Sequence, residues 1–231
     1  MSTRSYGGGF FPSLNEFWYP SWSSSAVQRY ARDGTYITNF DCGTSNIIQI
    51  WGEPDSRYYY TANWNSNYCQ KRGEFPSTSH MWTYHPDPRD SVGGISTDAT
   101  YAYCIHSGHF SLHVLDKMTG RLERRVELTG GSSGTLHGGL AVVGNKVYYG
   151  SSRTVHRYNL NDGHFDGYAF STEEDIDTMA FTGQDYCVSA GSSKVWCYRV
   201  RTSHSIVQRW SAPSRKTNKE ERLWWLWWLR H

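Results

Sequence analysis

Three histidines lie close together in the segment HSGHFSLH, at positions 106, 109 and 113. A zinc site needs three or four ligands that converge on one ion. Histidines at this spacing converge on a helix, but here a predicted turn separates His106 from His109, and His113 lies along the next predicted strand. Position 113 also corresponds to a packing position in other copies of the repeat described below, occupied by Gln28, His156 and Trp196. The segment therefore predicts no metal site, and His106 and His109 remain candidates for contacts with a partner or ligand.

Carboxylates form one dense group in the chain, made up of Glu173, Glu174, Asp175 and Asp177. A calcium site takes about six to eight oxygen ligands. The corresponding positions in the other repeat copies are Gly8-Gly9, Gln49, Gly93-Gly94 and Gly138-Gly139, so one acidic copy cannot build such a site. The sequence also lacks a Ser-His-Asp set, a phosphate-binding loop and an HExxH motif. We therefore expect no enzymatic activity and no cofactor.

Two tryptophans, Trp22 and Trp64, lie in nearly corresponding turns, each flanked by serine or asparagine. An aromatic plane beside hydroxyl and amide groups can stack on the apolar face of a sugar ring. The same chemistry makes an anchor for a protein partner. The alternative is that each indole packs over the edge of its own sheet.

The longest predicted connection runs from Pro76 to Ser91 and exceeds the usual two to six residues or so. It is therefore a candidate functional loop, although it could equally cover a wide gap between two repeat copies. Its candidate binding residues are His80, Trp82, Tyr84 and His85. Arg153 lies in a turn on the same predicted face and is a further candidate.

The C-terminal segment 220–231 contains seven consecutive leucines and tryptophans: Leu223, Trp224, Trp225, Leu226, Trp227, Trp228 and Leu229. This run is too short to span a bilayer, which needs about 20 apolar residues in a helix. It could close the ring, enter a groove on another subunit, or lie at a lipid surface beside Arg222 and Arg230. We expect docking to a protein partner or a second copy of the chain, with a membrane surface as the weaker alternative.

A repeat organises these segments. GGFFPSLNEFWY, from Gly8, matches GGLAVVGNKVYY, from Gly138, without a gap, and further copies begin near residues 48, 93 and 177. A period of about 40 to 45 residues is typical of propeller blades. The sequence therefore predicts an all-β fold, a single five-bladed β-propeller of four-stranded blades over residues 8–210. Residues 1–7 form an N-terminal arm, 211–219 a polar linker and 220–231 the tail.

Each copy predicts four short strands. The first begins with glycine, which suits close approach of backbones near an axis, and the second is rich in aromatic residues that can fill the space between blades. The fourth strands are predicted to end at Phe40, Phe75, Leu128, Phe170 and Trp210. Because the first copy starts with its own first strand and the last ends with its own fourth, closure should rest on side-chain packing without hydrogen bonds from residues 8–12 to the last blade.

Segments such as AVQRYARDGTYITNF and GGLAVVGNKVYYGSSRTVHRYNLNDG resemble blades of the NHL and YVTN-type β-propellers. The resemblance covers residues 8–210 and implies the fold. Blades of this kind serve scaffolds, sugar-binding lectins and a few enzymes, so the resemblance does not imply one function.

Composition adds two expectations. The net charge of +2 gives no bulk attraction to nucleic acid. The five cysteines are an odd number without CxxC spacing, which indicates buried free thiols rather than a disulfide framework. Together with the lack of an apolar N-terminal leader, this predicts the cytoplasm or another reducing compartment.

Two functions from different classes fit these patterns. The first is a non-catalytic scaffold or structural subunit that binds proteins through its loop face and tail. The second is a five-bladed lectin that binds glycans. A lectin should repeat its site in most blades, and the positions equivalent to the two tryptophans hold Ser107, Ser152 and Gly191 in the other copies. This difference favours the scaffold.

Overall fold

The computed structural model describes residues 8–86, 91–106, 109–131 and 139–182, together with the backbone of residues 186–190, 194–199 and 208–212. This part of the chain is nearly all β-structure, with one short 3-10 helix, η1 (Pro12–Leu14). None of its helices is long and apolar enough to cross a membrane.

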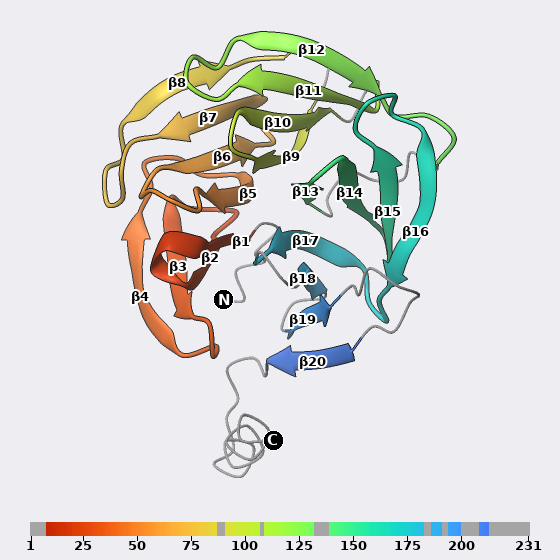
Figure 1. Cartoon of the computed structure of the whole chain (residues 1–231). Coiled ribbons are helices and arrows are strands. Elements are labelled where there is room, and N and C mark those ends of the chain that lie inside the picture. Colours follow the sequence, from red (N-terminus) through yellow and green to blue (C-terminus); the bar gives the residue numbers. More distant parts are fainter. Residues whose placement is uncertain are drawn as a thin grey trace.

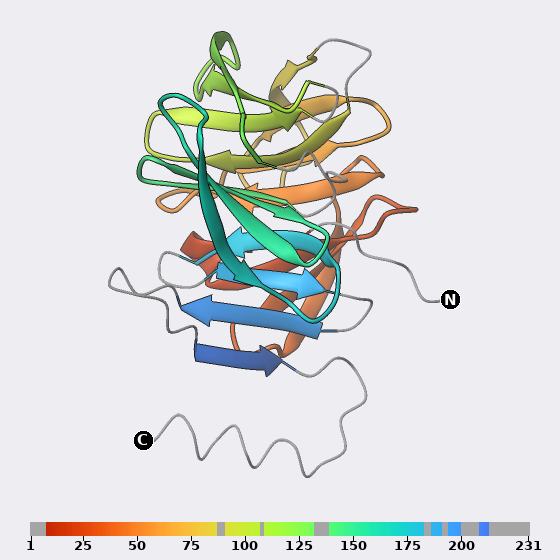
Figure 2. The same ribbon diagram turned by 90° about the vertical axis from the view of Figure 1, so that its right-hand side faces the viewer.

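The described strands form five antiparallel sheets of four consecutive strands each, arranged around a central axis like the blades of a propeller (Figure 1). The first strand of each sheet lies near the axis and the fourth lies at the rim. The side view shows the strands running between the two faces of the ring (Figure 2). The all-β propeller arrangement expected from the repeat is confirmed.

The strand bounds follow the repeat copies closely. Blade 1 contains β1 (Gly9–Phe11), β2 (Glu16–Pro20), β3 (Ala26–Ala31) and β4 (Tyr36–Asp41). Blade 2 contains β5 (Ile47–Gly52), β6 (Tyr59–Asn63), β7 (Tyr68–Arg72) and β8 (His80–Tyr84). Blade 3 contains β9 (Val92–Thr97), β10 (Tyr101–His106), β11 (Ser111–Asp116) and β12 (Leu122–Glu127).

The last two blades have the same order. Blade 4 contains β13 (Leu140–Val143), β14 (Lys146–Ser151), β15 (Thr154–Asn159) and β16 (Phe165–Ser171). Blade 5 contains β17 (Ile176–Phe181), β18 (Tyr186–Ala190), β19 (Lys194–Arg199) and β20 (Gln208–Ala212).

The fourth strand of blade 2 lies later in the chain than the sequence predicted. β7 pairs with β8, and Arg72 lies opposite His80, so the strand does not end at Phe75. Residues 73–79 instead form a connection in which Gly73 donates its backbone N–H to Ser79. Most of the predicted long loop is therefore edge strand and turn.

Glycines at the axis allow the first strands to approach closely, as the sequence predicted. A Cβ on Gly9 would lie 1.7 Å from the carbonyl oxygen of Ile50 in the next blade. A Cβ on Gly94 would lie 2.5 Å from Oε1 of Gln49. Neither position has room for a side chain.

The core lies between the blades and is built from large aromatic side chains. The largest side chains below 2 % exposure are Trp18, Tyr59, Tyr60, Tyr103, Tyr149 and Tyr158. Most of them come from the aromatic second strands. Buried clusters join residues of neighbouring blades, because the flat faces of adjacent sheets meet through these rings.

The ring closes between blade 5 and blade 1. β1 pairs with β2 of its own blade, so the described strands show no exchange between the ends of the propeller. Phe10 and Phe17 of blade 1 pack with Ala180 of blade 5. However, Gly8 donates its N–H to Oγ1 of Thr178 at 3.0 Å and accepts the hydroxyl proton at its carbonyl at 3.1 Å. The prediction of closure without such hydrogen bonds was therefore wrong.

Candidate functional site at the turns of blades 1 and 2

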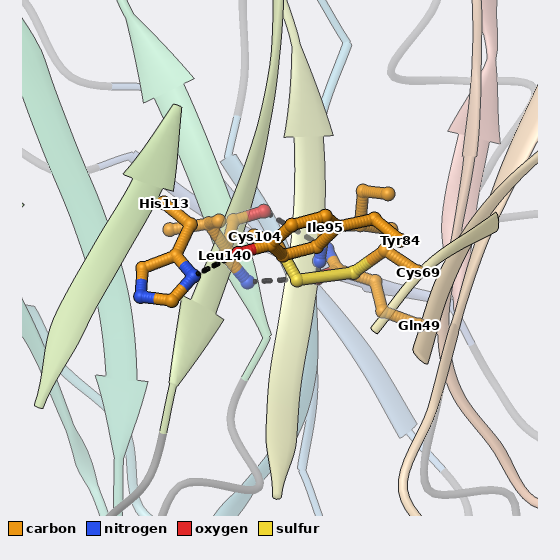
Figure 3. The surroundings of a disulfide bond; sticks show 7 residues. All are labelled: Gln49, Cys69, Tyr84, Ile95, Cys104, His113 and Leu140. Atoms are coloured by element: carbon orange, nitrogen blue, oxygen red, sulfur yellow. Dashed lines mark hydrogen bonds between the residues drawn. A yellow bond between two sulfur atoms is a disulfide. The ribbon is translucent and has the colours of Figure 1, made fainter. Parts of the chain in front are cut away.

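The axis of the ring is occupied by the side chain of Gln49, which is fully buried on β5. Its Oε1 accepts the backbone N–H groups of Ile95 and Leu140 at 2.9 and 3.0 Å. Its Nε2 donates to the carbonyls of Leu140 and Met179 at 2.9 and 2.8 Å. One side-chain amide of blade 2 thus bonds to blades 3, 4 and 5. Figure 3 shows Gln49 with two of its partners, Ile95 and Leu140.

The two tryptophans singled out by the sequence lie on either side of one residue, Asn46. The backbone N–H of Asn46 donates to the carbonyl of Trp22 at 3.0 Å, and Trp64 donates its N–H to the carbonyl of Asn46 at 3.2 Å. Asn46 has a φ of 57°, a left-handed conformation that asparagine adopts more readily than most residues. The connection between blades 1 and 2 therefore holds the backbones of both tryptophans next to Asn46.

Polar side chains surround this point. The amide of Asn63, which is 1 % exposed, donates to the carbonyl of Ser45 at 2.6 Å. The hydroxyls of Thr44 and Tyr68 are 2.7 Å apart, and Asn63 donates to that of Tyr68 at 3.3 Å. We name the set Trp22, Thr44, Asn46, Trp64 and Tyr68 the tryptophan face.

All members of the tryptophan face are half-buried. Trp64 also packs against two buried clusters, so part of its indole supports the core between blades 2 and 3. The packing alternative therefore holds in part for Trp64. The two tryptophans thus lie, half-buried, beside the hydroxyls of Thr44 and Tyr68. Aromatic rings beside hydroxyl groups can stack on a sugar ring or anchor a protein partner.

The candidate residues of the predicted loop are divided by the structure. His80 and His85 are exposed, and the ring of His85 meets Tyr68 edge-on with centroids 5.7 Å apart, so His85 adjoins the tryptophan face. Trp82 is 7 % exposed and donates its indole N–H to the carbonyl of Lys117 in blade 3 at 3.1 Å. The Tyr84 hydroxyl lies 2.8 Å from Nδ1 of His113. These last two residues join blades 2 and 3.

The histidines of blade 3 are not arranged around a common point. His106 is fully buried and stacks on His113 with ring centroids 4.0 Å apart, whereas His109 is exposed in the turn. Within the described residues there is no group of three or more side chains placed to hold a metal ion. Arg153 is exposed, and its Nε lies 3.4 Å from Oδ1 of Asp175.

A disulfide joins Cys69 on β7 to Cys104 on β10, with the Cα atoms 6.8 Å apart (Figure 3). The expectation of free thiols was wrong for this pair, whereas Cys42 is a free buried thiol. The cysteine argument for a reducing compartment therefore no longer holds. Cys187 and Cys197 lie opposite each other in the backbone register of β18 and β19.

A buried group of charges at the same blade junction was not anticipated from the sequence. Lys71, 2 % exposed, places Nζ 3.3 Å from Oε1 of Glu53, which is 8 % exposed. Tyr60 and Ser56 donate hydroxyl protons to the carboxylate, and Lys117 of blade 3 lies 4.0 Å away. Burial raises the pKa of Glu53, but these donors and the two ammonium groups outweigh it and hold the pKa below its usual value. Burial and the hydrogen bond to Glu53 raise the pKa of Tyr60.

Only part of the predicted binding surface can be placed. The Leu223 to Leu229 run lies outside the described residues. A comparison with models of known protein families found no match for this chain, and a comparison with curated proteins found none either.

Proposed function

We propose that this chain is a non-catalytic β-propeller scaffold that docks protein partners through the tryptophan face and through the tail at 220–231. The observation that carries the proposal is the tryptophan face. The backbones of its two tryptophans are held by hydrogen bonds to Asn46, and both residues are half-buried in turns between the second and third strands of their blades. Pre-ordered aromatic anchors reduce the entropy lost when a partner binds.

The arrangement at the axis supports a scaffold rather than an enzyme. Propeller enzymes gather their ligands where the first strands converge. In this chain the amide of Gln49 fills that space and has all of its donors and acceptors engaged by three blades. Such a group stabilises the ring and offers little to a substrate. We also propose that the blades are of the NHL or YVTN type, which they resemble in sequence. Many blades of that kind bind proteins, which favours a scaffold.

A lectin is the second candidate, favoured by the chemistry around the indoles. Hydroxyls of Thr44 and Tyr68 lie beside the two tryptophans and could hydrogen-bond to a sugar stacked on an indole. Against it, the other blades have serine or glycine at the corresponding positions. A site that occurs once gives weak avidity for repeated glycans.

One pair of measurements separates the two candidates. The full chain and the Trp22→Ala variant are applied to a glycan array, and the full chain and a chain lacking residues 220–231 are compared by sedimentation velocity. We expect no glycan binding, an assembly of the full chain, and a monomer with an unchanged thermal midpoint after the deletion. Reproducible glycan binding that Trp22→Ala abolishes would establish the lectin instead. If the deletion unfolds the ring, the tail is an internal plug and not a docking segment.

A further inference from the structure

The outer strand of blade 1, β4, is an exposed sheet edge with little charge. Five of its six residues are exposed, and among these Ile37 is 43 % and Tyr36 42 % exposed. Along the strand, residues 36–40 carry no charge at neutral pH, and Asp41 at its end is the one residue with a carboxylate. Neighbouring residues of a strand point to opposite faces, so both faces of this edge present uncharged side chains.

The outer strands of blades 2, 3 and 4 are better protected than residues 36–39 of β4. β4 has one register shift against β3, and Phe40 near its end packs on Tyr59 and Phe75 of blade 2, but the exposed residues before Phe40 carry no charge. The exposed residues of β12 are Glu123, Arg124, Arg125 and Glu127. β16 has register shifts at two points and an ion pair between Asp166 and Lys146. β8 is held against blade 3 through Trp82. Charges, bulges and covering contacts are the usual means by which natural sheets prevent an edge from pairing with another strand.

We propose that β4 receives the Leu223–Leu229 run of a second copy of this chain as an added strand, an inference that rests on the proposed tail docking. The run is apolar at every position and needs apolar contacts on both of its faces. β4 offers uncharged contacts on both faces as well as a row of backbone donors and acceptors. Seven residues in extended form span about 23 Å and a six-residue strand about 20 Å, so the lengths match.

The charges at the ends of the two segments are complementary in an antiparallel pairing. Arg222 directly precedes Leu223, and Asp41 ends β4. Hydrogen bonds from the Ser25 side chain and from Gly43 N–H lower the pKa of Asp41, so its carboxylate is ionised at neutral pH. Beside it lies a shallow depression that can accept a side chain of the tail, lined by Ser24, Ser25, Ala26, Asn39, Phe40 and Asp41.

The linker allows exchange between two copies. Residues 213–222 separate β20 from the run, and ten extended residues reach about 33 Å. Each copy carries one tail and one β4 edge, so mutual exchange gives a closed two-fold dimer in which the same contact occurs twice.

The test is sedimentation velocity of the full chain in three forms. The first is unchanged, the second carries Ile37→Lys and Thr38→Lys, which place one ammonium on each face of β4, and the third carries Tyr168→Lys on β16. Tyr168 is 63 % exposed on another outer strand and is a matched control. We expect the β4 variant to raise the dissociation constant of the dimer by about tenfold or more and the control to leave it within about twofold.

A charge exchange keeps the test independent of folding of the β4 variant. Asp41→Arg and Arg222→Asp should each weaken the dimer by about threefold, and the two together should restore it. If deletion of 220–231 abolishes the dimer while the β4 and charge variants do not, the proposed tail docking stands and the β4 assignment is wrong. If the deletion leaves association unchanged, both are wrong. A monomer whose β4 amides exchange faster after the deletion would show that the tail binds its own ring, which also overturns the proposal.

Discussion

The junction between blades 2 and 3 is held differently from the junction that closes the ring. Blades 2 and 3 share the Cys69–Cys104 disulfide, and Trp82 adds a hydrogen bond to Lys117. The buried Glu53 also faces Lys117 across the junction. A covalent bond and buried polar contacts thus lie within one pair of blades.

Among the described residues, the contacts that close the ring between blades 5 and 1 are non-covalent. Thr178 exchanges two hydrogen bonds with Gly8, and Phe10 and Phe17 pack with Ala180. Local opening begins where the least free energy holds the structure. Because the junction of blades 2 and 3 is held more strongly, we expect the ring to open first between blades 5 and 1, while blades 2 and 3 stay together.

The largest effect is expected at Gln49, through which blade 2 also reaches blades 4 and 5. Gln49→Leu removes the hydrogen-bond partner of two backbone N–H groups and two carbonyls at the axis. Each buried group left without a partner lowers the free energy of unfolding by about 1 to 3 kcal/mol. We expect a loss of about 4 kcal/mol or more in urea unfolding. Gln70→Leu is the matched control, because buried Gln70 donates one hydrogen bond, to Thr83, and should lose far less. Equal losses of unfolding free energy in the two variants would mean that the hydrogen bonds at the axis do not stabilise the ring more than an ordinary buried hydrogen bond.

Removal of the disulfide should come next. Cys69 and Cys104 are 35 residues apart, and the chain-entropy relation gives about 3 to 4 kcal/mol for a loop of that size. The Cys69→Ala/Cys104→Ala variant should lose about this much in urea unfolding, and dithiothreitol should destabilise the original chain by a similar amount. Cys42→Ala, which alters a free thiol, is the control. A destabilisation by dithiothreitol that persists in the double variant would assign the effect to other cysteines.

A smaller effect is expected at the closure. Thr178→Val keeps the shape of the side chain and removes the hydroxyl that binds Gly8, at a cost of about 1 to 2 kcal/mol. Thr97→Val is the control, because the buried hydroxyl of Thr97 makes no hydrogen bond within the described residues. Hydrogen exchange should show faster opening of β1 and β17 in Thr178→Val alone. Faster exchange in β7 and β10 instead would contradict the order of opening.

The sequence predicted what repeats from blade to blade. The strand order, the glycines at the axis and the aromatic second strands recur at fixed spacing, because each blade must solve the same packing problem. Blade 2 departed from this pattern at β8. It lacks the Asp-Gly turn of other copies, and the connection at residues 73–79 moves the fourth strand to His80.

Contacts between blades could not be predicted in the same way. The Cys69–Cys104 bond and the approach of Lys117 to Glu53 depend on which positions of neighbouring sheets face each other, and a periodic alignment compares equivalent positions instead. Gln49 was placed at the axis by its repeat position, but its bonds to three blades follow only from the closed ring. For the site, the turn positions of Trp22 and Trp64 were visible in sequence, and their shared contact with Asn46 was not.

The smallest expected effect is the pH dependence that Glu53 gives to the junction of blades 2 and 3. The pKa of Glu53 is lower in the folded chain than its ordinary value of 4.5. Its contribution to stability is therefore complete above that ordinary value and is lost as the pH falls through the lower folded value. Glu53→Gln removes this titration and serves as the reference. The difference in unfolding free energy between the two proteins should narrow by about 1 kcal/mol between pH 7 and pH 3. A difference that stays constant over this range would show that the carboxylate titrates alike in both states, and that Lys71 and Lys117 do not stabilise its charge.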